Sequence, residues 1–218
     1  MKRVLVKICG ITTVEDGLLA AEAGADAVGF VFYPMSPRRM TAERAAVVAR
    51  ELPPLVLRVG VFVNAPRDEM ARVADVVGLD LLQLHGEEEP AIFDQLPRRA
   101  LKAVRVGKGF TAQEALDYEG RAAGLLVDTR APGETMMPGG TGKTFDWTLV
   151  ESVRAGARFL MLAGGLCPEN VAEAIRVVRP DAVDVSSGVE GLPGRKDRER
   201  LTAFMGAVRS TEARSGER

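Results

Sequence analysis

The chain of 218 residues has little of the chemistry on which many enzymes depend. It contains one histidine and two cysteines. These are too few for the usual Cys/His zinc site or for a disulfide framework. A Ser-His-Asp hydrolase would have to use His85 as its base, because the chain has no second histidine. The scarcity argues against metal and catalytic-triad chemistry, so we expect no bound metal.

The chain also lacks an excess of charge and any long apolar run. Its 29 basic and 30 acidic side chains give a formal net charge of −1, which provides no field for attracting nucleic acid or an anionic membrane. No stretch approaches the roughly 18 apolar residues of a membrane span. Only three apolar residues separate Arg3 from Lys7, too few for a secretory signal. We therefore expect a cytoplasmic protein without nucleic-acid or membrane partners, in which local geometry holds any bound anion.

What the chain does contain is a regular alternation of two segment types. Short β-branched runs are the candidate strands: Val4–Ile8, Ala27–Phe32, Leu55–Val63, Leu79–Leu84, Leu101–Val106, Gly124–Asp128, Phe159–Ala163 and Ala182–Val185. Longer amphipathic segments are the candidate helices: Val14–Ala23, Ala42–Glu51, Arg67–Val77, Ala112–Tyr118, Pro168–Val178 and Arg198–Val208. Alternating strands and helices indicate parallel strands joined by helical crossovers.

Eight such units of about 27 residues each match a (β/α)8 barrel near its minimum length. We predict an α/β fold with a single-domain TIM barrel over residues 1–209 and a frayed tail over 210–218. The alternative is an open doubly wound sheet. No G-x-G-x-x-G follows the first strand, and the even spacing of the units favours closure.

Polar residues gather where the predicted strands end, which is where barrel enzymes carry their chemistry. These strand-end residues are Lys7, Cys9, Asn64, Gln83, His85, Asp128, Gly164, Gly165 and the run Asp184 to Gly188. Alternation along the strands should point Lys7, Cys9, Asp128 and Asp184 into the barrel mouth. Because the first and last strands of a closed barrel are neighbours, we expect Lys7 to pair with Asp184.

Cys9 and Asp128 should face each other across the mouth, which suits a base and an acid on opposite sides of one ligand. A base at Cys9 needs a tuned thiol, and a Lys7 cation beside it would favour the thiolate. The alternative is that Cys9 is an inert buried cysteine. Cys167 is interpreted as structural. An aspartate that ends an apolar strand rarely serves packing alone.

Two small-residue loops indicate a phosphate site. Gly164 and Gly165 follow the seventh strand, and the run Ser186 to Gly188 follows the eighth. Phosphate sites of such barrels typically use these two loops and their backbone N–H groups, which glycine lets an anion approach. The alternative is two ordinary tight turns.

Several blocks resemble the phosphoribosylanthranilate isomerase family of tryptophan biosynthesis. They are Lys7-Ile8-Cys9-Gly10-Ile11-Thr12, Gly29-Phe30-Val31-Phe32 with Ser36-Pro37-Arg38, Gly60-Val61-Phe62-Val63-Asn64, Gln83-Leu84-His85-Gly86, Leu126-Val127-Asp128-Thr129, Gly139-Gly140-Thr141-Gly142-Lys143-Thr144-Phe145-Asp146-Trp147, Ala163-Gly164-Gly165-Leu166 and Asp184-Val185-Ser186-Ser187-Gly188-Val189-Glu190. The blocks follow one another in this order over nearly the whole chain.

The resemblance implies a cofactor-free Amadori rearrangement of a small phosphoribosyl substrate. It implies that Cys9 is the general base and Asp128 the general acid. It assigns the anthranilate carboxylate to Arg38, with Arg39 as a rival, and a ribose hydroxyl to Asp184. A solvated loop charge is the alternative for Arg38. It assigns the phosphate to Gly164, Gly165, Ser186, Ser187 and Gly188, and Lys7, Gln83 and His85 are further candidates for contact with the substrate.

The loop from Arg130 to Pro138 is longer than this family leads us to expect, and could act as a lid. Rival interpretations are another phosphate-binding barrel of the same pathway, a metal-dependent sugar-phosphate epimerase and a non-catalytic binding protein. The first would leave Cys9 without a role, the second needs more histidines, and the third does not need Cys9 opposite Asp128. We expect a monomer or a homodimer.

Overall fold

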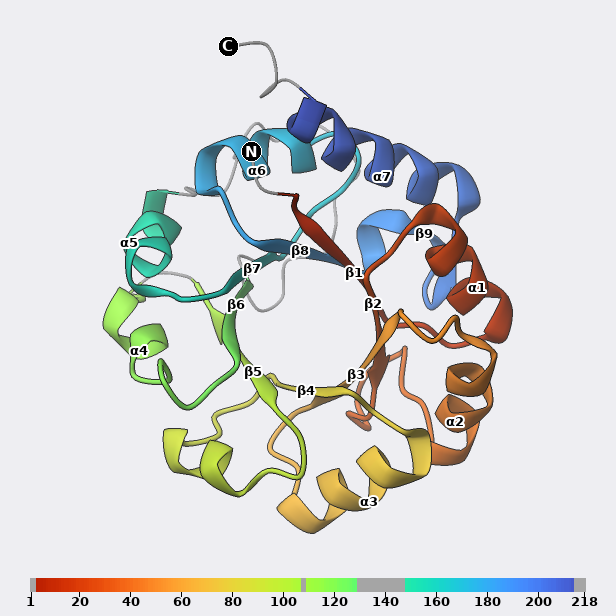
Figure 1. Ribbon diagram of the computed structural model, residues 1–218, viewed down its shortest axis with the longest axis horizontal. Coiled ribbons are helices and arrows are strands. Elements are labelled where there is room, and N and C mark those ends of the chain that lie inside the picture. Colours follow the sequence, from red (N-terminus) through yellow and green to blue (C-terminus); the bar gives the residue numbers. More distant parts are fainter. Residues whose placement is uncertain (1–2, 107–108, 129–147, 214–218) are drawn as a thin grey trace.

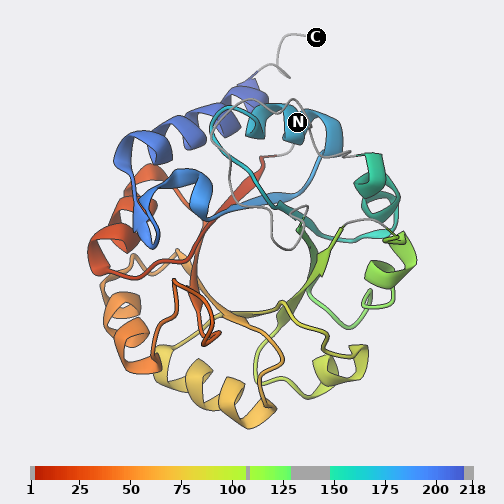
Figure 2. The same ribbon diagram turned by 180° about the vertical axis from the view of Figure 1, so that it is seen from behind.

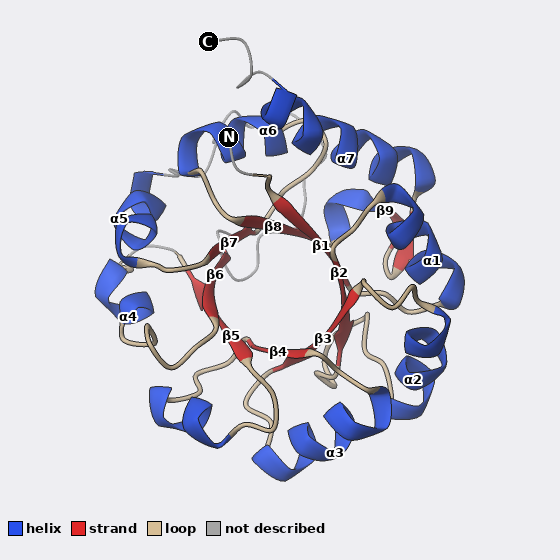
Figure 3. Cartoon of the chain, in the orientation of Figure 1, coloured by secondary structure: helices blue, strands red, loops and turns tan. Residues whose placement is uncertain are grey.

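The fold is a closed barrel of parallel strands inside a ring of helices (Figures 1 and 3). The computed structural model describes residues 3–106, 109–128 and 148–213. The barrel strands, in both chain order and spatial order, are β1 Leu5–Cys9, β2 Ala27–Val31, β3 Leu57–Phe62, β4 Leu81–Leu84, β5 Ala100–Arg105, β6 Gly124–Asp128, β7 Leu160–Ala163 and β8 Ala182–Val185. β8 pairs with β1, so the barrel prediction is confirmed.

Helices form the outer layer of the molecule (Figure 2). They are α1 Val14–Ala23, α2 Ala42–Glu51, α3 Arg67–Val77, α4 Ala112–Leu116, α5 Thr148–Gly156, α6 Val171–Val178 and α7 Arg198–Ala213. Side-chain oxygens of Thr13 and Thr41 accept N–H groups of the first turns of α1 and α2, which is why both helices begin as predicted. The connection after β4 contains a short 3₁₀ helix, Pro90–Gln95. None of the described helices is long and apolar enough to cross a membrane.

Three predicted helix boundaries were wrong. α4 ends at Leu116 and not at Tyr118. α6 begins at Val171 and not at Pro168, because the Asn170 side chain turns back to bond the N–H of Cys167 at 2.9 Å and the carbonyl of Gly165 at 3.0 Å. α7 continues to Ala213, past the predicted end at Val208. Residues 210–213 of the predicted tail are therefore helical, and residues 214–218 lie outside the described part of the chain.

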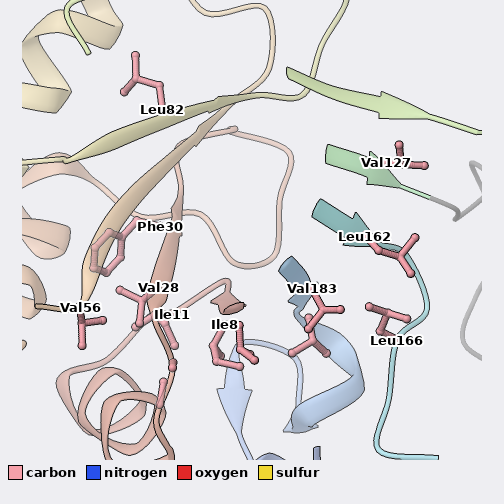
Figure 4. Packing of buried hydrophobic residues seen from close by; sticks show 14 of the residues in the cluster. Ile8, Ile11, Val28, Phe30, Val56, Leu82, Val127, Leu162, Leu166 and Val183 are labelled. Carbon is pink, nitrogen blue, oxygen red and sulfur yellow. The ribbon is translucent and has the colours of Figure 1, made fainter. Parts of the chain in front are cut away.

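Strand alternation divides the core into two parts. One side of each strand packs against the helices, as Ile8, Phe30 and Leu82 do in Figure 4. The other side fills the barrel interior with a smaller apolar group: Leu101, Ala103, Leu126, Met161, Ala163 and Ala182. Polar residues on the same inward faces line the opening at the carboxyl ends of the strands, so the apolar group forms a floor beneath the candidate site.

A short hairpin interrupts the last unit of the barrel. After β8 the chain makes one 3₁₀ turn, Ser187–Val189, and then the antiparallel pair β9 Glu190–Leu192 and β10 Arg195–Lys196. Figure 2 shows this blue hairpin beside α1 at the rim of the barrel. The Thr12 hydroxyl donates to the carbonyl of Gly194 at 2.6 Å, which joins the hairpin to the loop after β1.

Candidate active site

A cavity of about 270 Å³ opens at the carboxyl ends of the barrel strands. The structure brings together nearly all of the predicted site residues around it: Cys9, Arg38, Gln83, His85, Asp128, Gly164, Gly165, Asp184, Ser186, Ser187 and Gly188. Lys7 and Asn64 do not line the cavity: Lys7 is buried, and the Asn64 side chain accepts the N–H of Glu87. The inward orientation predicted for Cys9 and Asp128 is confirmed.

The predicted ion pair beneath the cavity is present. Lys7 Nζ donates to Asp184 Oδ1 at 2.9 Å, and the two side chains are 1% and 9% exposed. The β1–β8 register places these two residues directly opposite each other. Burial of either charge alone would be strongly unfavourable, so the two side chains can be buried only as a pair.

The Lys7 cation favours the Cys9 thiolate, as predicted, but in the ligand-free site burial outweighs this effect. Burial raises the pKa of the Cys9 thiol above its ordinary value, because it disfavours the thiolate more than the Lys7 cation favours it. The Asp184 carboxylate raises the pKa of Cys9 further. Cys9 therefore rests as a neutral thiol. The backbone makes room for it, since a Cβ on Gly29 of β2 would lie 2.8 Å from Cys9 Sγ.

Asp128 lies on the other side of the cavity in a more open setting. Its Oδ2 lies 3.3 Å from His85 Nε2, without hydrogen-bond geometry, and each of the two side chains is 20% exposed. His85 Nδ1 in turn lies 3.5 Å from Gln83 Nε2. Catalytic hydrogen bonds are often long in the absence of a ligand, so this arrangement suits a carboxyl group that exchanges a proton with a bound molecule.

The two small-residue loops form one end of the cavity. Gly164 and Gly165 have φ angles of 88° and 64°, a backbone region that side chains disfavour. A Cβ on Gly188 would collide with the carbonyl oxygen of Leu166, so only glycine lets loops seven and eight come this close. The Asn170 bonds described above hold loop seven in place. Such a backbone cradle suits a phosphate group.

Arg38 enters the cavity from the loop after β2, whereas Arg39 is exposed and does not line it. Arg38 Nε and Nη2 donate to Glu190 Oε1 and Oε2 at 2.7 and 2.5 Å. Lys196 Nζ donates to the same carboxylate at 2.9 Å. The arginine is thus held in place and is not the solvated loop charge considered as its alternative.

Sequence reasoning missed several residues around the cavity. Glu190 was named only as the last residue of a block that resembles the family, and Lys196 was not among the residues predicted to lie in the site. Arg105 ends β5 and lines the cavity beside Asp128 in register. Strand parity could have found Arg105, because it shares the inward face of Leu101 and Ala103. No periodic pattern marks Glu190 or Lys196, which lie in a hairpin of five strand residues.

The proposed lid loop, Arg130 to Pro138, lies outside the described residues. Within the described ranges, no group of three or more His, Cys, Asp or Glu side chains is placed to hold a metal ion.

The fold and the cavity define a class of protein: a (β/α)8-barrel enzyme whose cavity is lined by a thiol, a carboxyl group and two glycine-rich loops. Residues 6–207 match the family model described as N-(5′-phosphoribosyl)anthranilate (PRA) isomerase. The chain belongs to this family.

Named relatives agree over nearly the full length of the chain. The N-(5′-phosphoribosyl)anthranilate isomerase of Pseudomonas fluorescens is 51% identical over 96% of this chain and 100% of its own. That of a Geobacter species is 53% identical over 92% and 95% of the two chains. The crystal structure of phosphoribosyl anthranilate isomerase from Thermotoga maritima has a TM-score of 0.88 and 48% identity, and the match covers 95% of this chain and 99% of the other.

Proposed function

We propose that Cys9 and Asp128 are the base and the acid with which this chain isomerises N-(5′-phosphoribosyl)anthranilate to 1-(2-carboxyphenylamino)-1-deoxyribulose 5-phosphate, a step of tryptophan biosynthesis. The observation that carries this assignment is the placement of one thiol and one carboxyl group on opposite sides of a single cavity that ends in a glycine-rich cradle. The acid and the base face the ligand from the two directions that the rearrangement requires.

The proton transfers balance without a cofactor. Asp128 gives a proton to the ribose ring oxygen as the C1′–O bond breaks, and the nitrogen lone pair forms the C1′=N bond of a Schiff base. Cys9, after losing its own proton to solvent, then removes the C2′ proton as the thiolate, which produces an enolamine and returns Cys9 to the thiol. Tautomerisation of the enolamine to the 2′-ketone completes the reaction, and Asp128 regains from solvent the proton that it gave to the ring oxygen.

Other cavity residues orient the substrate in this proposal. Backbone N–H groups and hydroxyls of the cradle residues bind the phosphate: Gly164, Gly165, Ser186, Ser187 and Gly188. Arg38 binds the anthranilate carboxylate, for which a guanidinium is geometrically suited. Asp184 accepts a ribose hydroxyl with the oxygen that Lys7 does not use. His85 lies beside Asp128, and Gln83 lies beside His85. In this proposal the imidazole orients the Asp128 carboxyl group toward the ring oxygen.

A solved isomerase is in complex with reduced 1-(o-carboxyphenylamino)-1-deoxyribulose 5-phosphate, and it shares 45% identity and a TM-score of 0.84 with this chain. We infer that the same phosphorylated product class fills the cavity here. The Thermotoga maritima isomerase is described as dimeric. For this chain we propose a cytoplasmic monomer or homodimer, with no nucleic-acid or membrane partner.

A fluorescence assay for the loss of phosphoribosylanthranilate tests the assignment. Cys9→Ser and Asp128→Asn should each lower kcat by roughly 10²–10⁴-fold, the usual contribution of a positioned acid or base. Cys167→Ser is the matched control, because Cys167 does not line the cavity, and it should keep wild-type turnover. Wild-type turnover in both Cys9→Ser and Asp128→Asn would overturn the roles given to the two residues.

The carboxylate site has its own test. Arg38→Ala should weaken the binding of carboxylate-bearing product analogues, measured by calorimetry, while Arg39→Ala should leave it unchanged. The reverse result would transfer the role to Arg39.

A further inference from the structure

Lys196 of β10 is a buried cation for which the reaction scheme above has no use. Its side chain is 0% exposed, and all three ammonium protons have acceptors. Nζ donates to the carbonyl of Cys9 at 2.6 Å, to the carbonyl of Ser186 at 3.1 Å and to Glu190 Oε1 at 2.9 Å. One side chain thus joins the strand of the proposed base, the proposed phosphate loop and a third group, Glu190.

Glu190 extends this network to Arg38. Its two oxygens accept Nε and Nη2 of the guanidinium, and the carboxylate side chain is only 5% exposed. Burial raises the pKa of Glu190, but its bonds to Arg38 and Lys196 lower that pKa by more. The pKa of Glu190 is therefore below its ordinary value and the carboxylate is ionised. With two cations and one anion, the cluster has a net positive charge that favours an anionic ligand.

The geometry of the guanidinium decides what remains free. Glu190 occupies the edge formed by Nε and Nη2. The second edge, formed by Nη1 and the other Nη2 proton, has no hydrogen-bond partner among the described residues, and Arg38 lines the cavity. A planar fork that is fixed along one edge presents the other in a set direction. The stem is fixed as well, because Arg38 Cδ lies over Gly10, where a Cβ would be 2.5 Å away.

We propose that Glu190 and Lys196 are positioning residues: they aim the free edge of Arg38 at the substrate's ring carboxylate and hold it in register with Cys9 and the phosphate loop. This inference rests on the proposed function. Neither residue touches the reacting atoms in this scheme. Their contribution is to fix the distance between the carboxylate and phosphate ends of the ligand, so that its C2′ proton lies at the thiol.

The experiment compares two ligands in three proteins. The ligands are the reduced product analogue and its counterpart without the ring carboxylate, with binding measured by calorimetry. The proteins are the wild type, Glu190→Gln, which keeps the shape but removes the charge, and Arg198→Met. Arg198 forms a 3.5 Å pair with Glu22 in which the side chains are 71% and 64% exposed, so its variant is a matched control outside the cavity.

In Glu190→Gln, affinity for the carboxylate-bearing analogue should fall roughly tenfold or more, while affinity for its counterpart stays at the wild-type value. KM for phosphoribosylanthranilate should rise by a similar factor, with a smaller change in kcat. Unchanged affinity for both ligands, or an equal loss for both, would overturn the proposal, because a general structural defect does not distinguish the ligands. Arg198→Met should match the wild type.

Lys196→Met tests the other link, with inorganic phosphate as the probe. Loss of the bonds to Ser186 and Glu190 should weaken phosphate and the carboxylate-bearing analogue together, and wild-type affinity for phosphate would overturn the role of Lys196. If Lys196→Met does not fold, Lys196→Gln, which keeps a donor, takes the same test. A wild type that binds both ligands but does not turn over phosphoribosylanthranilate refutes the proposed function and leaves the positioning test intact.

Discussion

The two sides of the cavity are built differently. On the β1–β8 side, Lys7 and Asp184 pair at 2.9 Å with side chains 1% and 9% exposed, and Lys196 is buried beneath the neighbouring loop. On the β4–β6 side, His85 and Asp128 are 3.3 Å apart and each is 20% exposed. The proposed base therefore lies among fixed, dry charges, and the proposed acid lies in contact with water.

The Cys9 thiol and the Asp128 carboxyl group therefore need different surroundings. A buried thiol is protected from solvent, but its environment must be assembled from paired charges, since any unpaired one would destabilise the fold. A carboxyl group at the water boundary needs little support and can regain its proton from solvent. Substitutions among the buried charges around Cys9 should therefore affect stability and rate together, whereas those of the partly exposed His85 and Asp128 should affect rate alone.

The largest effect should come from Lys7→Met. The change leaves Asp184 buried without its cation, so the free energy of unfolding should fall by about 3–5 kcal/mol. Urea denaturation measures it. The control is Arg3→Met, which removes an exposed partner of Asp26 and should change stability by about 1 kcal/mol or less. Equal losses in the two variants would contradict the contrast between the two sides.

The next effect is on the pH dependence of kcat/KM. A base works when it is deprotonated, and burial raises the pKa of Cys9, so the fraction of thiolate at neutral pH is small and grows with pH. The rate should rise about tenfold per pH unit from about pH 7 upward. Asp128→Asn should keep this slope at a lower rate, while Cys9→Ser should lose it. A flat wild-type profile would mean that the thiol is already ionised.

Gly29→Ala should have a smaller effect on the same side. The new Cβ would lie 2.8 Å from Cys9 Sγ and 3.1 Å from Lys7 Cε, so the base must shift. We expect a loss of about 1–3 kcal/mol in unfolding free energy, together with a lower kcat. Gly206→Ala in the exposed part of α7 is the matched control. It meets no atom within 4 Å and should be neutral or stabilising by about 0.5–1 kcal/mol.

The smallest effect should be that of His85→Gln on the β4–β6 side. Removing the imidazole beside Asp128 should lower kcat about tenfold, because the carboxyl group loses a neighbour that orients it. The unfolding free energy should change by no more than about 0.5 kcal/mol, as for other partly exposed side chains. A large loss of stability without a loss of rate would contradict the expectation that His85 affects the rate and not the stability.

Strand alternation made the site residues on the barrel strands predictable. A single parity rule placed Lys7, Cys9, Asp128 and Asp184 on inward faces, and barrel closure then paired Lys7 with Asp184. The glycine positions in loops seven and eight were predictable because few other residues allow that backbone. These features depend on local geometry, which a sequence records directly.

The remainder of the site depends on contacts that leave no local pattern. The Arg38–Glu190 pair joins residues 152 positions apart, through a hairpin too short to show periodicity. The pKa of Cys9 depends on the balance between burial and the Lys7 charge, and a sequence shows the charge but not the extent of burial. The start of α6 was misplaced because the Asn170 side chain bonds backward, which the helix-start signal of Pro168 does not reveal.

The bonds of Lys7 and Lys196 also have a consequence for biosynthesis of the chain. Lys7 meets Asp184 177 residues later, and Lys196 meets the carbonyl of Cys9 across 187 residues. During translation, β1 with the proposed base Cys9 is therefore synthesised long before Asp184 and Lys196, the residues that it contacts. Contacts of such long range form late in folding. Catalytic activity should therefore appear only when the last strand and its hairpin have joined the first, so that turnover reports ring closure.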